Sequence, residues 1–408
     1  MRILQVNKFY FDRGGAERYY FGLTDLLRAR GHEVIPFSCL YPTSKDTPWQ
    51  KYFVTPIVTE RLRFGWQGIR TASRFFWSRE AARKLDQLLH KTHIDVAHLH
   101  NIYHQLSPSI LSVLRRHRVP TVMTLHDFHL VSPAYNLTGH GGRCAHARGG
   151  KWWETVRHRC VRDSLVASLL CAGELMIHRS LGFYERGIQL FIAPSHFMQE
   201  TITAWGFRPR EMVIIPNFTD VPKAIEHQVG EYVLFSGRLS REKGIAQFFE
   251  VARQCPDVPF LIVGDGPLRS DVEAQVKELN NVQYAGFVEP SVMPSFIARA
   301  LAVIIPSVAP EVFPMAALEA QAAGKAVAAF AVGGIPEIVT DGEHGLLAPE
   351  GDASALAKAV QRLIHDRPMA RSMGSEAYAR AVRDFSADAH YHTIMDVYQR
   401  VIDHNVTP

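Results

Sequence analysis

Two glutamates lie eight residues apart in the stretch PEVFPMAALEA, at Glu311 and Glu319. The run ALAVIIPS before it has the pattern of a buried strand, and AALEAQAAG after it has the pattern of a helix. Glu311 therefore belongs to a strand-to-helix turn, where it can reach a ligand. Glu319, one to two turns into the helix, can accept hydrogen bonds from two vicinal hydroxyls. It could instead be a solvated helix residue, but its apolar neighbours favour a buried carboxylate with partners.

The same turn offers backbone donors. The N–H groups near Phe313 and Met315 lie at the expected start of the helix, where a phosphate can bind. Pro314 lacks an N–H, but it suits the first helical position. One element could thus hold a sugar, a phosphate and a ribose together.

A second candidate loop is SGRLSREKG, which follows the buried strand YVLFS. Arg238 offers a planar guanidinium that can donate two parallel hydrogen bonds, and Lys243 offers a compact ammonium charge. Two such cations in one strand-end loop suit a diphosphate. A solvated charged loop would have the same composition. The later stretch VGDGPLR could approach a base or ribose, or simply turn the chain.

In the first half of the chain, Gly14 and Gly15 lie between the first strand and the first helix, in FDRGGAER. Adjacent glycines there let backbone N–H groups approach a phosphate, although a tight turn would also use them. The stretch is not a G-x-G-x-x-G fingerprint, and no acidic residue clearly ends the second strand. A dinucleotide is therefore disfavoured.

Histidines cluster at other strand ends. TLHDFHL places His126 and Asp127 after a strand, where a neutral imidazole can accept a hydroxyl hydrogen bond or relay a proton. A lone histidine is more often structural. His98 and His100 point to one face of a strand, but no third ligand has a convincing spacing, so a metal there is disfavoured.

The segment GGRCAHARGGKWWETVRHRCVR is harder to interpret. Its cysteines and histidines could form a zinc site, although their spacing is irregular: Cys144, His146, His158 and Cys160. A basic, aromatic loop insertion is the alternative. Residues 60–84 also mix arginine with Phe and Trp, which suits either an interfacial membrane surface or a solvated helix with one core face.

Composition limits the class of protein. The chain has 408 residues, 47% of them apolar, which is enough for two domains. Its five cysteines include no C-x-x-C pair, which favours a reducing cytoplasm over a disulfide framework. No apolar run approaches the length of a membrane span, and the start of the chain does not read as a secretory signal.

The charge is unevenly distributed. The net charge of +5 combines +13 over residues 1–216 with −8 over residues 217–408. A basic half could meet nucleic acid, an anionic membrane or an acidic substrate. Since no zinc-finger or RNP motif is present, nucleic acid is not expected.

Short apolar strands alternate with helical patterns in both halves, which predicts an α/β protein with two doubly wound domains facing across a cleft. The expected divisions are an N-terminal domain (1–210), a linker (211–228), a C-terminal domain (229–384) and a terminal helix that packs back on the first domain (385–408).

Taken in order, these motifs resemble glycosyltransferase family 4, retaining enzymes of the GT-B fold. The resemblance rests on Gly14-Gly15, His126, GRLSREKG, GDGP, E-x7-E and GGIPEIVTDGEHGLL, and it covers nearly the whole chain. It implies a nucleotide-diphosphate sugar donor, UDP- or GDP-linked, held mainly by the second domain. It also implies transfer to a glycan or lipid-linked acceptor in surface polysaccharide or glycoconjugate synthesis.

The resemblance assigns roles to matching positions. Arg238 and Lys243 match residues that neutralise the diphosphate, Glu311 the carboxylate at the donor sugar, and Glu319 the ribose-binding glutamate. In the first half, His126 matches a histidine near the transferred sugar, and Gly15 a glycine near the diphosphate. The remaining expected contacts are Phe313, Pro314 and Met315 on the donor and Gly14, Glu17, Asn101 and Asp127 on the acceptor side.

Two departures from the family pattern stand out. The common turn E-G-F-G is Glu311-Val312-Phe313-Pro314 here, so an N–H is lost at 314 and Met315 supplies the nearest one. Relatives with similar segments often have C-x-x-C where this chain has Cys144 and Ala147, so no metal-binding property of that loop is carried over.

The resemblance implies front-side retention, in which the departing phosphate oxygen takes the acceptor's proton. With Arg238 and Lys243 in place and no D-x-D motif, no metal or other cofactor is expected. The basic first half would face a lipid-linked or anionic acceptor, with the enzyme cytoplasmic and peripheral at the inner membrane face. The alternatives are a GT-B hydrolase or epimerase, for which no carboxylate pair is evident, and a non-catalytic nucleotide-sugar binder.

Overall fold

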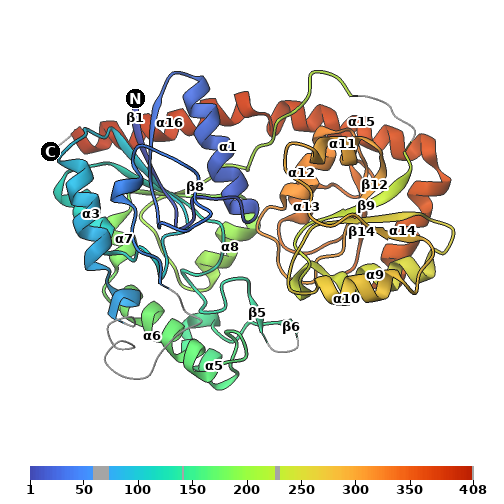
Figure 1. Cartoon of the computed structure of the whole chain (residues 1–408), viewed down its shortest axis with the longest axis horizontal. Helices are drawn as coiled ribbons and strands as arrows, with labels where there is room; N and C mark the ends of the chain where they lie inside the picture. Colours follow the sequence, from blue (N-terminus) through green and yellow to red (C-terminus); the bar gives the residue numbers. More distant parts are fainter. Residues whose placement is uncertain (58–72, 140–141, 226–229, 407–408) are drawn as a thin grey trace. The chain divides into compact units, whose positions relative to one another are not determined.

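The computed structural model describes residues 1–57, 73–139, 142–225 and 230–406. They form two compact units, one of Met1–Ile215 with Tyr391–Pro408 and one of Pro216–His390. Figure 1 labels their helices and strands. Most of the basic, aromatic segment expected at a membrane surface, residues 60–72, lies outside the described residues. Among the described helices, none combines the length and the apolar character that a membrane span requires.

The first unit is built on a six-stranded sheet in the order β2-β1-β3-β4-β7-β8, with every pair parallel. Apart from the edge strand β8, its strands are almost wholly buried, which explains their continuous apolar runs. The strands are β1 (Arg2–Val6), β2 (Glu33–Phe37), β3 (Val96–Leu99), β4 (Thr121–Thr124), β7 (Leu190–Ala193) and β8 (Met212–Ile214).

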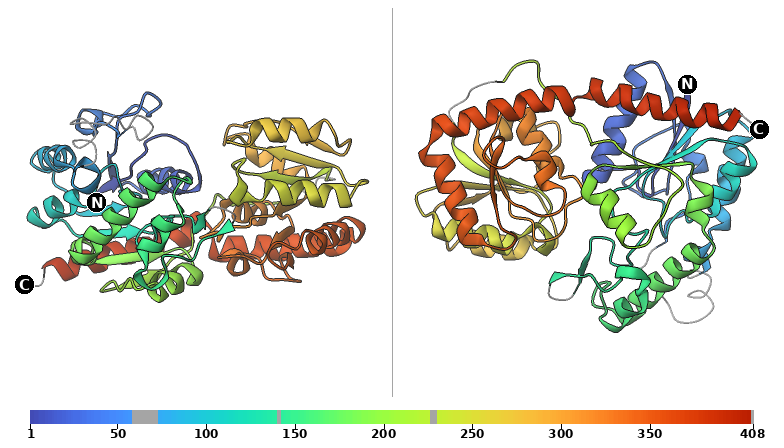
Figure 2. Two further views of the ribbon diagram at one scale, coloured as in Figure 1. Left: turned by 90° about the horizontal axis from the view of Figure 1, so that it is seen from below. Right: turned by 180° about the vertical axis from the view of Figure 1, so that it is seen from behind.

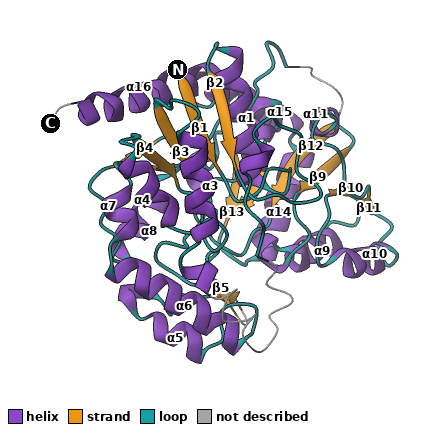
Figure 3. Ribbon diagram, turned by 60° about the vertical axis from the view of Figure 1, so that its left-hand side comes forward, coloured by secondary structure: helices purple, strands orange, loops and turns teal. Residues whose placement is uncertain are grey.

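Helices cover both faces of this sheet, as the strands (orange) and helices (purple) of Figure 3 show. Serine caps begin several of them: Ser78, Ser164 and Ser195 each accept a hydrogen bond from an N–H of the first helical turn. The helices are α1 (Gly15–Ala29), α3 (Arg79–Leu89), α4 (Ser109–Arg116), α5 (Trp152–Arg157), α6 (Leu165–Ser180), α7 (Phe183–Gly187) and α8 (His196–Ala204), with short 3-10 turns at Gln50–Tyr52 and Arg148–Gly150.

A small subdomain lies between β4 and α8 in the sequence. It contains the hairpin β5 (Thr138–Gly139) and β6 (Gly142–Arg143), followed by α5 and α6, which pack together. The hairpin, α5 and α6 lie at the margin of the first unit (Figures 1 and 2).

The second unit has a six-stranded parallel sheet in the order β11-β10-β9-β12-β13-β14. This is the doubly wound order in which the chain reverses direction between the first and fourth strands. The strands are β9 (Tyr232–Ser236), β10 (Phe260–Val263), β11 (Val282–Tyr284), β12 (Ala300–Ile305), β13 (Val327–Phe330) and β14 (Gly345–Ala348).

The helices of the second unit enclose its sheet from both sides (Figure 2), with α9 beside α14 and α12 beside α15. They are α9 (Ile245–Gln254), α10 (Arg269–Val276), α11 (Met293–Ala298), α12 (Met315–Ala322), α13 (Ile335–Ile338), α14 (Ala353–His365) and α15 (Arg367–Asp384), and a 3-10 turn spans Arg241–Lys243. The fold is therefore α/β with two doubly wound units, as the sequence predicts.

The boundaries differ in detail from the expected divisions. β8 pairs with β7, so the first unit extends to Ile215 rather than to residue 210. The terminal helix α16 (Ala387–Val406) belongs to the first unit from Tyr391 onward. There the Tyr391 hydroxyl lies 2.9 Å from His32 Nε2, and the Tyr398 hydroxyl lies 2.6 Å from His98 Nδ1.

Candidate functional site

The strand order of the second unit places two loops side by side at the carboxyl ends of β9 and β12. Because the chain turns in opposite directions after these neighbouring strands, a crevice for a ligand opens at this point in doubly wound sheets. Arg238 and Lys243 belong to the first loop, and Glu311 belongs to the second. The structure therefore brings these predicted residues to one edge of one sheet.

Lys243 and Glu311 form an ion pair across this edge. The Lys243 ammonium donates to Glu311 Oε1 at 2.6 Å, and the Ser307 hydroxyl donates to the same oxygen, also at 2.6 Å. Ser307 is buried, whereas the side chains of Lys243 and Glu311 are 33% and 14% exposed. The pair is thus oriented by a buried hydroxyl and remains open to a ligand.

A close backbone contact sets the position of Lys243. The 3-10 turn ends at Gly244, whose φ is +72°, and a Cβ there would lie 1.7 Å from the carbonyl oxygen of Pro306. Only glycine fits this left-handed, crowded position. The N–H groups of Val308 and Ala309 also donate to the Glu242 carbonyl, so the two loops are joined along their backbones.

A glycine pair supports Glu311 from the other side. Gly334 N–H donates to the Glu311 carbonyl at 2.7 Å, and a Cβ on Gly333 would lie 2.3 Å from the same oxygen. In the sequence this pair opens GGIPEIVTDG, in the loop that follows the buried strand Val327–Phe330, and this place after an apolar run is the signal for its role.

The Gly-rich bend VGDGP has a packing role as well. A Cβ on Gly264 would lie 1.8 Å from the Gly237 carbonyl oxygen, and one on Gly266 would lie 2.5 Å from that of Leu239. These two glycines therefore let the bend pack against the loop that contains Arg238. Arg238 itself is exposed at the end of β9.

Helix α12, which follows the turn that contains Glu311, begins at Met315. Pro314 is its N-cap, with φ −70° and ψ 120°. The expectation that Pro314 is the first helical residue is therefore wrong by one position, because its ψ is extended. No side chain caps this helix, and the Ala317 and Leu318 N–H groups donate to the Pro314 carbonyl, which leaves those of Met315 and Ala316 for a ligand. Phe313 is buried, with its ring centroid 5.8 Å from that of Phe385.

Glu319 is half-buried, between the buried Leu318 and Ala320. It shares the partly exposed face of α12 with Met315 and Ala316. A helix face that combines free N–H groups at its start with a carboxylate one turn later fits the predicted combination of phosphate and ribose.

The corresponding edge of the first unit contains Gly14 and Gly15 at the start of α1. Gly14 is the N-cap in an extended conformation, and a Cβ there would meet only Glu17 Oε2, at an ordinary 3.8 Å. Neither backbone conformation nor internal packing requires glycine at position 14. Glycine is a common N-cap residue, and its small size also lets a ligand approach the start of α1.

Glu17 and Asn101 meet through Asn7, which the sequence reading did not single out. Asn7 Nδ2 lies 3.3 Å from Glu17 Oε1, and Asn101 N–H donates to Asn7 Oδ1 at 3.3 Å. Burial raises the pKa of the Glu17 carboxyl, although Lys8 opposes the shift. The buried Asn101 Oδ1 accepts no hydrogen bond from the part of the chain that the structure describes. Asp127 instead accepts from His129 N–H within its own loop.

His126 is half-buried and belongs to a column of histidines. Its Nε2 lies 3.0 Å from His100 Nδ1, and the His100 ring in turn stacks on His98 with centroids 4.4 Å apart. Burial, assisted by the charge of Lys8, lowers the pKa of His126 to about 3. His126 is therefore a neutral imidazole at physiological pH, suited to accept or relay a hydrogen bond.

Comparison with known proteins decides the family. Residues 13–223 match the family model described as Glycosyltransferase Family 4, and residues 219–380 match the model described as Glycosyl transferases group 1. The chain belongs to glycosyltransferase family 4. The family members to which it is similar are transferases, and its two-domain architecture is of the GT-B type.

Two curated proteins and one solved structure show which kinds of protein this chain is similar to. A phosphatidyl-myo-inositol mannosyltransferase of Mycobacterium leprae is 25% identical over 98% of this chain and 97% of its own. An exopolysaccharide phosphotransferase of Streptomyces coelicolor is 35% identical over 45% of this chain and 18% of its own. The structure of Anabaena HepE with UDP and glucose shares the fold, with a TM-score of 0.69 at 21% identity over 98% of this chain and 100% of that one. The chain spans 18% to 48% of the length of the first five curated relatives that it matches.

Proposed function

We propose that the protein is a retaining glycosyltransferase that moves a sugar from a UDP- or GDP-sugar to a glycan or lipid-linked acceptor during synthesis of a surface polysaccharide or glycoconjugate. The observation that carries the proposal is the Lys243–Glu311–Ser307 contact at the carboxyl ends of β9 and β12. It combines a cation for a diphosphate with a carboxylate for sugar hydroxyls. Family membership supports the class of reaction.

The donor would be held by the second unit. The Lys243 ammonium has three N–H donors, so it can keep Glu311 and still donate to a phosphate oxygen. Arg238 adds a second cation from the same exposed loop, and the start of α12 adds backbone N–H groups. Negative charge that develops on the leaving nucleoside diphosphate would be stabilised by these groups, without a divalent metal.

Retention would follow a front-side route. The departing phosphate oxygen takes the proton of the attacking hydroxyl, and the new glycosidic bond forms on the face that the phosphate leaves. Glu311, held by Ser307, orients the donor sugar rather than attacking it. His126 stays neutral because its pKa is about 3, so it can accept a hydrogen bond from a sugar hydroxyl.

An exposed apolar face on α6 supports a lipid-linked acceptor. On this helix Leu165, Val166 and Leu169 are each about half exposed, and Met176 and Ile177 continue the same face. Apolar residues exposed on a helix of a basic domain suit an anionic membrane surface. We therefore place the enzyme in the cytoplasm, peripheral at the inner membrane face.

The test is a transfer assay in the presence of EDTA. The purified chain is incubated with UDP-glucose, UDP-N-acetylglucosamine or GDP-mannose and with short glycans or polyprenyl-diphosphate-linked sugars as acceptors. Mass spectrometry detects the product, and NMR gives its anomeric configuration. We expect one donor to yield a product with the donor's own configuration, and Glu311→Ala to abolish transfer.

The other outcomes separate the alternatives. Free sugar without acceptor consumption would indicate a hydrolase, and a changed sugar in the nucleotide pool would indicate an epimerase. A product of inverted configuration, or activity only with added Mg²⁺, would contradict the proposed mechanism. Nucleotide binding without turnover of any donor would favour a non-catalytic binder.

A further inference from the structure

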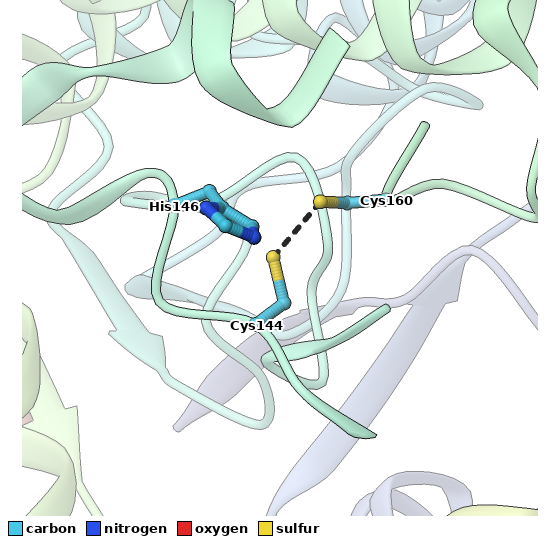
Figure 4. A group of neighbouring side chains, drawn as sticks. All are labelled: Cys144, His146 and Cys160. Carbon is cyan, nitrogen blue, oxygen red and sulfur yellow. Dashed lines mark hydrogen bonds between the residues drawn. The ribbon is translucent and has the colours of Figure 1, made fainter. Parts of the chain in front are cut away.

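The small subdomain of β5, β6, α5 and α6 contains a cluster of metal-ligating side chains that the proposed reaction does not use. Cys144 follows strand β6, His146 lies two residues later, and Cys160 follows helix α5. The Sγ atoms of the two cysteines are 3.0 Å apart. A ring nitrogen of His146 and both sulfurs lie within 4.8 Å of one another (Figure 4).

We propose that Cys144, His146 and Cys160 bind a zinc ion that cross-links this subdomain. Two thiolates and an imidazole are a ligand set typical of zinc, which takes Cys sulfur at about 2.3 Å and His nitrogen at about 2.0 Å. Tetrahedral geometry would separate the sulfurs by about 3.8 Å, so zinc entry requires them to move apart by less than about 1 Å. The fourth position is left to a small ligand such as water.

The surroundings are arranged like a metal site, with buried sulfurs and an imidazole at the surface. Cys144 and Cys160 are 2% and 7% exposed, whereas His146 is exposed. Cys144 N–H donates to the Leu137 carbonyl, and Cys160 N–H to the Thr155 carbonyl, so the backbone aims both sulfurs inward. The ion would therefore reach the site from the side of His146.

The His146 ring is itself oriented by a neighbour. It stacks on His158 with ring centroids 3.9 Å apart and an interplanar angle of 5°. The His158 Nε2 lies 3.8 Å from the Glu154 carboxylate on the same helix, α5. The stacking limits the orientations that the His146 ring can take.

The packing around the cysteines explains why this subdomain needs a cross-link. In the part of the chain that the structure describes, their hydrophobic cluster consists of Ala134, Cys144 and Cys160, and strands β5 and β6 have two residues each. Three non-glycine residues next to Cys160 adopt left-handed conformations: Arg159, Arg162 and Asp163, with φ between 48° and 55°. A core this small does not by itself hold a strained loop, whereas a bound metal can.

The experiment uses the full chain, purified under reducing conditions with added Zn²⁺ and then desalted. Elemental analysis should find one zinc ion per chain in the wild type and almost none in Cys144→Ser or Cys160→Ser. Cys171→Ser is the matched control, because Cys171 is also a buried free cysteine but lies on α6, outside the ligand group. This variant should retain its zinc.

Two further measurements separate ligand loss from misfolding. Replacement of zinc by Co²⁺ should give thiolate-to-cobalt charge-transfer bands and the visible bands of a tetrahedral site in the wild type. His146→Ala removes an exposed side chain, so the chain should fold normally, yet a chelator should strip its zinc at least tenfold faster than from the wild type. This assay needs no sugar donor, so its outcome is independent of the proposed reaction.

Two results would overturn the proposal. One is a natively folded wild type that retains no zinc after desalting. The other is a zinc-free protein whose mass under non-reducing conditions is lower by two hydrogens, with Cys144 and Cys160 recovered as one disulfide-linked peptide.

Discussion

Replacing Lys243 by alanine should weaken the binding of a nucleoside diphosphate while leaving the fold intact. The Lys243 ammonium is a donor for a charge-assisted hydrogen bond, a type that contributes about 1.5–3 kcal/mol. Its side chain is 33% exposed, so solvent screening favours the lower part of that range, about 1.5–2 kcal/mol. Binding should therefore weaken about 10- to 30-fold.

The free energy of unfolding should change little in the same variant. Glu311 keeps its hydrogen bond from Ser307 and is itself partly exposed, so the lost ion pair should cost at most about 1 kcal/mol. Chemical denaturation monitored by circular dichroism measures this quantity. A binding loss without a matching stability loss would identify Lys243 as a ligand contact.

Titration calorimetry of UDP and GDP in EDTA gives the binding loss. Lys358→Ala is the matched control, because it removes an exposed lysine from α14 in the same unit. The nucleosides uridine and guanosine, which lack the diphosphate, should bind the wild type and Lys243→Ala equally. Unchanged UDP and GDP affinities in Lys243→Ala, or an equal loss for the nucleosides, would refute the assignment of Lys243 to the diphosphate.

Three further predictions concern positions that the structure singles out. Gly264→Ala should destabilise the second unit by more than about 2 kcal/mol and weaken nucleotide binding, because its Cβ would overlap the Gly237 carbonyl; a melting temperature equal to that of the wild type would contradict this. Burial lowers the pKa of His390 to about 4, below its usual 6.5, so between these pH values the folded state binds fewer protons than the unfolded state. The free energy of unfolding should therefore fall by on the order of 3 kcal/mol as the pH drops from about 6.5 towards 4. Denaturation curves of His390→Gln, measured across this range, should lose this pH dependence. Although burial opposes it, His104 lowers the pKa of the buried Glu174 carboxyl, with its Nδ1 2.5 Å from Oε2. Burial lowers the pKa of His104 itself, so at neutral pH the contact joins a neutral imidazole to a carboxylate. His104→Phe should therefore cost about 1–3 kcal/mol at neutral pH, and a second substitution, Glu174→Gln, should recover much of that loss.

Much of the fold could be predicted from local patterns. Apolar runs alternating with helical periodicity mark the strands of both sheets, and serine and aspartate caps mark several helix starts. The sequence predicts that Arg238, Lys243 and Glu311 lie in loops at the ends of strands, and the structure places them there. Local patterns were enough here because each of these features lies within a few residues of a strand.

The contacts that join distant parts of the chain could not be predicted in this way. Lys243 and Glu311 are 68 residues apart and meet because β12 lies beside β9, a neighbour relation that no single segment contains. The same holds for His100 and His126, which follow the neighbouring strands β3 and β4. Ser307 gave no signal, because a serine after a strand is common in any loop.

The contact between the two clustered cysteines could not be predicted from local patterns either, although they are closer in the sequence. Cys144 and Cys160 are 16 residues apart with irregular spacing, and a short hairpin and helix bring them together. The exposed face of α6 could not be predicted for a different reason. Its apolar composition suggests a core, but burial depends on what packs against each face, and one face of α6 remains exposed.

The most direct test of the donor site is the melting temperature of the full chain in EDTA with UDP, GDP or ADP and their common sugar conjugates, repeated with Mg²⁺. A ligand that binds only the folded state must raise the melting temperature. The account predicts a rise with one uridine or guanosine diphosphate that is independent of Mg²⁺ and lost in Lys243→Ala. No rise with any nucleotide, or a rise that requires Mg²⁺, would contradict a metal-free nucleotide-sugar site at Lys243 and Glu311.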